Sequence, residues 1–161
     1  MKKTKVYLDT SVINYLVAAR LPDKMNDTLT LWEIFASEER FEVVLSETVH
    51  HELQACYEPK RSRLFEMVSE MDHSLVLMTE DIIALANHYV EFGVLTKDSY
   101  SDLLHIAAAT VNECKLIVSW NFKHFVNFKT MDRVNAVNLI EGYNAIRIVS
   151  PSMFLGELNN E

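Results

Sequence analysis

The feature that most constrains the fold is an alternation of short strand-like runs with longer amphipathic stretches along the 161 residues. Five runs rich in β-branched and aliphatic residues predict strands: Lys5–Leu8, Phe41–Leu45, Leu75–Met78, Leu116–Ser119 and Ala145–Val149. Strands that alternate with helices favour an α/β fold, a three-layer α/β/α sandwich around a mainly parallel five-stranded sheet.

Between the strands, apolar residues recur at helical spacing, and polar or glycine residues mark the ends of the helices. The predicted helices run from Thr10 or Ser11 to about Ala19, then over Thr28–Ser37, Glu47–Ala55, Leu64–Met71, Thr79–Gly93, Ser99–Cys114 and Met131–Glu141. One domain over residues 1–150 accounts for all of these elements, and Ser150-Pro151 ends the last strand. We therefore expect residues 151–161 to form a C-terminal tail.

Charge and cysteine content exclude several classes of protein. The chain has 15 basic and 23 acidic residues, a net charge of −8, which argues against a broad basic surface for nucleic acid. Cys56 and Cys114 form no CxxC pair, so neither a disulfide scaffold nor a zinc ribbon is expected, and a reducing cytoplasm fits best. No stretch has the roughly 18 apolar residues of a membrane span.

Polar residues stand where three of the predicted strands end. Asp9 follows the first strand, Ser46-Glu47 the second and Ser119-Trp120-Asn121 the fourth. A further acid, Asp102, lies near the start of the apolar helix Ser99–Cys114. Because ligands of open parallel sheets bind outside the carboxyl ends of the strands, this edge is the candidate site.

Several carboxylates at one edge would repel one another. Two unit charges about 4 Å apart repel by about 4 kcal/mol at an effective dielectric constant near 20. A bound cation removes this repulsion, and ligands that are all oxygen select a hard ion such as Mg²⁺ or Mn²⁺.

Two glutamates of the second predicted helix compete for a place in such a cluster. Glu47 and Glu52 are five residues apart, roughly 140° around a helix, so they cannot both face one pocket. Glu52 lies one turn after Thr48, on the side that a helix would present inward, which gives it a mild preference.

Four segments in order resemble the motifs of the PIN-domain nucleases: YLDTS (7–11), SETVHHEL (46–53), DLLHIAAA (102–109) and LIVSWNFKHF (116–125). Each motif is weak by itself, but four in order, each at the end of a strand or on a helix, cover nearly the whole chain. The resemblance is greatest to the VapC-like toxins of bacterial toxin–antitoxin pairs.

The resemblance implies a PIN-like fold and an endoribonuclease that depends on Mg²⁺ or Mn²⁺. It also implies a cognate antitoxin protein as partner, an RNA substrate and a homodimer. Asp9, Glu52 and Asp102 carry over as metal ligands, and together with Asn121 they form the candidate catalytic set. At the fourth position relatives often have an acid, whereas this chain has the amide Asn121, which leaves a second metal site open.

Each candidate also has a simpler structural interpretation. Asp9 could cap the first helix, Glu52 could be a solvated helix charge, and Asp102 could complement a helix dipole. Asn121 is equally well explained as a turn residue. We expect Ser119 to support the site by hydrogen bonding.

Outside the motifs, the only dense basic run is Lys60, Arg61 and Arg63. Contact with an RNA backbone is one interpretation of this run, and a solvated helix face is the other. Apolar residues of Leu64–Met71 and Thr28–Phe35 fit either a core or a groove for an antitoxin segment or a second subunit.

The predicted chemistry is hydrolysis of RNA phosphodiester bonds assisted by a metal ion. A catalytically weakened PIN-like module that binds RNA or a protein without cutting is the alternative, because of the missing fourth acid. A phosphatase-like enzyme with Asp9 as nucleophile is disfavoured, since a second acid is usual two residues later and position 11 is Ser.

Overall fold

The centre of the fold is β1 (Thr4–Leu8), whose last three residues are completely buried. In the computed structural model, which describes residues 2–161, this strand pairs in parallel with β2 (Phe41–Ser46) and with β4 (Leu116–Val118). The edge strands are β3 (Ser74–Val76) and β5 (Arg147–Val149), so the order is β3-β2-β1-β4-β5. All four pairings are parallel, which confirms the predicted sheet.

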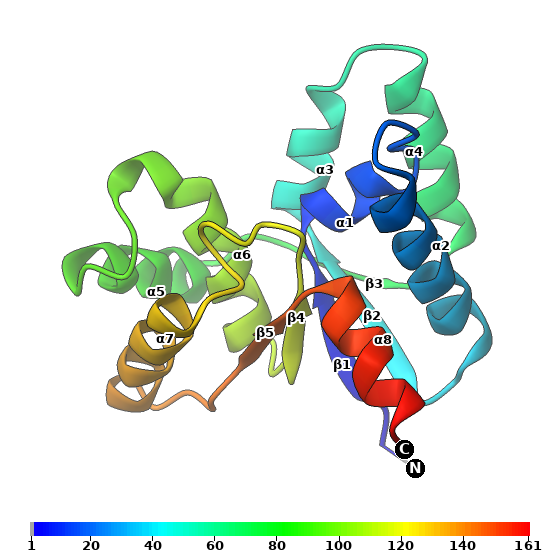
Figure 1. Cartoon of the computed structure of the whole chain (residues 1–161). Helices are drawn as coiled ribbons and strands as arrows, with labels where there is room; N and C mark the ends of the chain where they lie inside the picture. The colour runs from blue at the N-terminus through cyan, green and yellow to red at the C-terminus, as the bar shows by residue number, and fades with distance from the viewer. Residues whose placement is uncertain (1) are drawn as a thin grey trace.

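Helices cover both faces of this sheet (Figure 1). The first half of the chain supplies α1 (Thr10–Tyr15), α2 (Pro22–Ser37), α3 (Glu47–Gln54) and α4 (Lys60–Glu70). The second half supplies α5 (Glu80–Glu91), a 3₁₀ turn at Lys97–Ser99, α6 (Tyr100–Val111), α7 (Phe128–Ile140) and α8 (Pro151–Asn159). In Figure 1, α2 and α8 lie on one side of the strands, and α5, α6 and α7 lie on the other. The predicted three-layer α/β/α sandwich is therefore confirmed.

Helix ends differ from the predictions where local capping decides them. We expected a helix to begin at Thr28, but α2 begins six residues earlier at Pro22, which needs no backbone N–H partner in the first turn. α7 begins at Phe128 instead of Met131, because the side chain of Asn127 accepts a hydrogen bond from the Thr130 backbone N–H (2.8 Å).

The C-terminal segment, which we expected to be a tail, is mostly a helix packed on the domain. Ser150 caps α8 by accepting a hydrogen bond from the backbone N–H of Met153 (3.1 Å). The ring of Phe154 lies 5.4 Å from Phe35 of α2 and 5.5 Å from Phe41 of β2, measured between ring centroids. These aromatic contacts make α8 part of the sandwich.

Within residues 2–161, no helix is both long enough and apolar enough to cross a membrane. Cys56 and Cys114 are both free thiols.

Candidate functional site

Asp9 lies directly after β1, at the carboxyl edge of the sheet, and is only 4% exposed. One carboxylate oxygen accepts hydrogen bonds from the Ser11 hydroxyl (2.5 Å) and from the Val12 backbone N–H (3.4 Å), so Asp9 also caps α1. The other oxygen accepts a hydrogen bond from the Ser119 hydroxyl (2.6 Å). Burial raises the pKa of Asp9, although the charge of His105 and these hydrogen bonds act against that rise.

Glu52 on α3 is held by residues of α6. Its Oε1 atom accepts a hydrogen bond from the Ser101 hydroxyl (2.9 Å) and lies 2.6 Å from Nε2 of His105. Partial burial raises the pKa of Glu52, but the hydrogen bond and charge of His105, together with the hydroxyls of Ser101 and Thr10, lower it by more, so the net shift is downward. Glu52 is therefore an ionised acceptor, and Nε2 of His105 donates to it.

The other ring nitrogen of His105 faces β1. His105 is 2% exposed, and its Nδ1 lies 2.6 Å from the hydroxyl of Tyr7, which lies 2.7 Å from the hydroxyl of Ser46. Burial raises the pKa of Tyr7 well above its ordinary value, so its hydroxyl keeps its proton. In a neutral His105 ring the protons then run in one direction: Ser46 donates to Tyr7, Tyr7 to Nδ1, and Nε2 to Glu52.

Asp102 in the first turn of α6 is paired with His124. Its Oδ2 atom lies 2.7 Å from Nδ1 of His124. The backbone N–H of His124 donates to Oδ1 of Asn121 (3.1 Å), and the backbone N–H of Asn121 donates to the Ser119 hydroxyl (2.9 Å). Asn121 thus shapes the turn that places His124, which agrees with the turn interpretation of this residue.

One short hydrogen-bonded path connects Asp9 with Asp102, and Glu52 is bonded to two neighbours of Asp102 on α6. The path leads from Asp9 through Ser119, Asn121 and His124 to Asp102. Glu52 contacts α6 on both sides of Asp102, through the neighbouring Ser101 and through His105 three residues later. The fold brings these acids, which are far apart in sequence, to one neighbourhood at the sheet edge.

Glu47, the glutamate that competed with Glu52 in the sequence, is not part of this neighbourhood. Its Oε2 atom accepts a hydrogen bond from the backbone N–H of Met78 (2.5 Å), which follows β3. Ser46, at the N-cap position of α3, makes no side-chain capping bond and contacts Tyr7 instead. Glu47 thus has a structural partner, and Glu52 is the glutamate beside α6.

The donor set fits a hard divalent ion in its chemistry. Three carboxylates from three elements supply oxygen ligands, and the buried hydroxyl of Thr10, next to Asp9, lies close enough to Glu52 to help lower the pKa of that carboxyl. Residues 2–161 contain no preformed group of three acidic, histidine or cysteine side chains arranged around a metal position. Each carboxylate is instead held by a hydroxyl or an imidazole, and these contacts use Oε1 of Glu52 and Oδ2 of Asp102.

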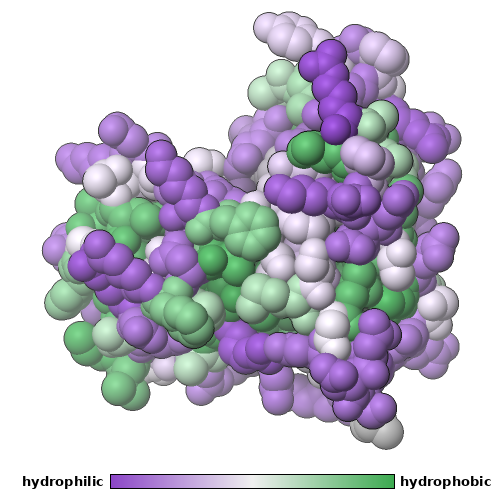
Figure 2. Space-filling view, viewed as in Figure 1, coloured by the Kyte–Doolittle hydropathy of each residue, from purple (hydrophilic) through white to green (hydrophobic). Residues whose placement is uncertain are grey.

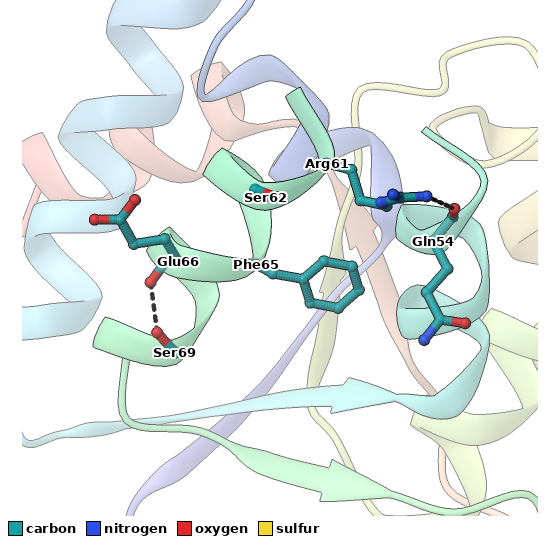
Figure 3. A pocket seen from close by; sticks show the side chains of 6 residues that line it. All are labelled: Gln54, Arg61, Ser62, Phe65, Glu66 and Ser69. Atoms are coloured by element: carbon teal, nitrogen blue, oxygen red, sulfur yellow. Dashed lines mark hydrogen bonds between the residues drawn. The ribbon is translucent and has the colours of Figure 1, made fainter. Parts of the chain in front are cut away.

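The dense basic run lies at a different place. Arg61 is 3.7 Å from Glu58 and donates to the Gln54 carbonyl (3.5 Å), and Arg63 is 3.8 Å from Glu66. Figure 3 shows the pocket of about 780 Å³ next to this run, with Arg61 reaching across to Gln54. It is lined by Gln54, Arg61, Ser62, Phe65, Glu66 and Ser69, so its basic and acidic side chains offset one another.

Tyr7, His105 and His124 were not expected at this site from the sequence. The spacing of Asp102 and His105, three residues apart on one helix, could have indicated a shared face. The partners of the two histidines are far away in sequence, so no local pattern predicts these contacts.

Neither a family model nor a curated protein matches the sequence. Solved structures do match over nearly the whole length. One is a VapBC2 structure from Rickettsia felis, bound to a DNA fragment from the promoter of its genes, with a TM-score of 0.59 and 13% identity over 91% of this chain and 98% of that one. Another is VapBC-1 from nontypeable Haemophilus influenzae, with a TM-score of 0.58 and 14% identity over 92% and 99%.

At these identities the likeness concerns the fold. It agrees with the parallel sheet order and with the helices on both faces of the sheet. The chain therefore has the PIN-like α/β fold of the chains matched in these VapBC structures, as its sequence predicted.

Proposed function

We propose that this protein is a metal-dependent endoribonuclease and the toxin of a toxin–antitoxin pair. The observation that carries the proposal is the gathering of Asp9, Glu52 and Asp102 at the carboxyl edge of a PIN-like sheet. The likeness to VapBC structures supports a cognate antitoxin protein as partner. We also propose that the protein forms a homodimer and acts in the cytoplasm.

In the proposed reaction the three carboxylates hold Mg²⁺ or Mn²⁺. When bound, such an ion activates water for attack on phosphorus and stabilises charge on the leaving oxygen. Ser119 and Ser11 orient the Asp9 carboxylate, and His105 orients Glu52. Asn121 keeps its side-chain amide N–H groups as donors for a phosphate oxygen, since its Oδ1 atom already accepts from His124.

Cleavage of a mixed pool of structured RNA tests this proposal. Purified wild type and Asp102→Asn, each with Mg²⁺, Mn²⁺ or EDTA, are compared by gel after both are shown to be folded by circular dichroism. We expect cutting by the wild type with metal only, and at least a roughly 100-fold slower reaction for Asp102→Asn, because changes beside a metal ligand already cost about 10- to 100-fold. Equal cutting by both proteins would contradict the assignment.

A second candidate is a module that binds RNA or protein without cutting. It is favoured by the amide at position 121 and by the histidine contacts that occupy Glu52 and Asp102 in place of a preformed metal cluster. A calorimetric titration separates the two candidates. Heat from Mn²⁺ binding to the wild type, lost in Asp102→Asn, favours the nuclease, whereas no binding at millimolar metal favours the module.

Tyr7→Phe should weaken metal binding without a change in any proposed ligand. Loss of the hydroxyl leaves Nδ1 of His105 without its donor, so the ring can change tautomer and stop donating to Glu52. We expect about 10-fold weaker binding of Mn²⁺, together with a change in the ¹⁵N shifts that report the His105 tautomer.

The matched control is Tyr89→Phe, which removes another buried hydroxyl, one that donates to Asn138 (2.5 Å). It should lower the thermal stability in the same way as Tyr7→Phe and leave both metal affinity and the His105 signals unchanged. Equal metal affinities of the two variants would rule out this role of Tyr7.

A further inference from the structure

A second pocket adjoins the candidate site and has the opposite charge. It has a volume of about 650 Å³ and lies between residues 90–99, at the end of α5 and after it, and residues 122–133, at the start of α7. His124, the partner of Asp102, lines it. The pocket therefore opens beside one of the three carboxylates.

Its lining contains three cations, Lys123, Lys129 and Arg133, and no Asp or Glu. In a chain with 23 acidic and 15 basic residues, a pocket lined at random would carry more acids than bases. All three side chains belong to exposed residues, and within residues 2–161 none of them forms an ion pair with a carboxylate. Their charge is available to an anionic ligand, unlike that of the paired Arg61 and Arg63.

Two further features define the kind of anion. Arg133 donates a hydrogen bond to the carbonyl of Gly93 (2.9 Å), which also lines the pocket, so its guanidinium is held at the pocket wall. Phe122 lines the same pocket and is 46% exposed, with Nζ of Lys24 5.5 Å from its ring centroid. An aromatic face beside cations is the combination that binds single-stranded nucleic acid, by stacking a base and neutralising phosphates.

We propose that this pocket is a subsite for the backbone of single-stranded RNA next to the bond that is cut. Lys123, Lys129 and Arg133 contact phosphates, and Phe122 stacks on a base. A strand bound here continues past His124 to the carboxylates, so the basic pocket supplies the RNA affinity that the acidic edge lacks. The inference rests on RNA being the substrate of the proposed function.

The test is binding of a short fluorescent single-stranded RNA to the full chain in EDTA, followed by anisotropy at several salt concentrations. Lys129→Gln with Arg133→Gln is compared with Arg61→Gln with Arg63→Gln, which removes the same charge from α4. We expect the pocket variant to bind about 10-fold more weakly, with a salt slope reduced by about 1.4 for two lost phosphate contacts. The α4 variant should change by less than about 2-fold.

Phe122→Ala gives an independent readout, because loss of stacking should weaken binding by about 5-fold or more with an unchanged salt slope. Equal weakening by the pocket and α4 variants would show a general charge effect and overturn the proposal, as would unchanged binding by the pocket variant. Polyglutamate serves as a second anionic probe in the same assay. If its binding needs Lys129 and Arg133 and RNA does not compete with it, the pocket binds an acidic protein segment and the proposal is wrong.

Binding in EDTA is measured without cleavage, so the two proposals can fail separately. If the protein binds RNA through the pocket but cuts no RNA, the subsite proposal stands and the nuclease proposal is wrong. If the protein cuts RNA with metal but its RNA affinity does not depend on the pocket, the nuclease proposal stands and the subsite proposal is wrong.

Discussion

Asp9→Asn should abolish metal-dependent cleavage while the fold stays at least as stable as that of the wild type. Asn caps a helix about as well as Asp, so its Oδ1 atom can still accept from Ser11 and from the Val12 backbone N–H. The new amide N–H group meets the Ser119 hydroxyl, which can rotate and accept instead of donating. The loss of one carboxylate ligand should slow cleavage by more than about 100-fold.

The stability part of this prediction follows from the sign of the pKa shift. Burial raises the pKa of Asp9 in the folded state, so protonation favours folding, and this stability is lost as the pH rises through the folded-state pKa. Without metal, the raised pKa of Asp9 therefore lowers the stability of the fold at pH values above the pKa of Asp in the unfolded chain, and Asn removes that effect. We expect an equal or higher melting temperature.

Thermal unfolding with and without Mg²⁺ checks both parts. The ion should raise the melting temperature of the wild type, because a ligand that binds only the folded state stabilises it, and it should not raise that of Asp9→Asn. A variant that melts well below the wild type would show that Asp9 is mainly a structural cap. A variant that cuts RNA at the wild-type rate would remove it from the site.

Of the variants proposed for this protein, Phe154→Ala should lower the free energy of unfolding most, although Phe154 lies in the last helix of the chain. Phe154 is 5% exposed, and its ring contacts Phe35 and Phe41, which are themselves 5.5 Å apart between ring centroids. Truncation of a buried Phe costs about 3–5 kcal/mol, through lost burial and the cavity that remains. For a chain of this length that corresponds to a fall in melting temperature of roughly 6–20 °C.

Phe128→Ala is the matched control, since Phe128 is 84% exposed at the start of α7. It should change the free energy of unfolding by less than about 0.5 kcal/mol. Chemical denaturation of both variants measures the difference. A small effect of Phe154→Ala would mean that α8 contributes little to the stability of the domain.

The alternation of strands and helices was enough to predict the sheet, because the period of apolar residues is a local property. It also placed Asp9 and Ser119 at strand ends, where parallel strands bring polar residues to one edge. The ends of the helices were less predictable. Several weak local signals can start a helix, and the sequence does not show that α2 begins at Pro22 and not at Thr28. The packing of α8 depends on Phe35 and Phe41, more than 100 residues earlier, and no local pattern reports that contact.

In the candidate site, too, some features follow from the local sequence and others only from the tertiary structure. Residue type and position by themselves placed Asp9 at the sheet edge, because that follows from where β1 ends. Only the tertiary structure decided that Glu52 and not Glu47 faces α6, since that depends on the rotation of α3 against its neighbours. It also decided that Tyr7 and His105 hold Glu52, and that three cations gather beside Asp102, because those contacts join residues that the chain brings together only when it folds.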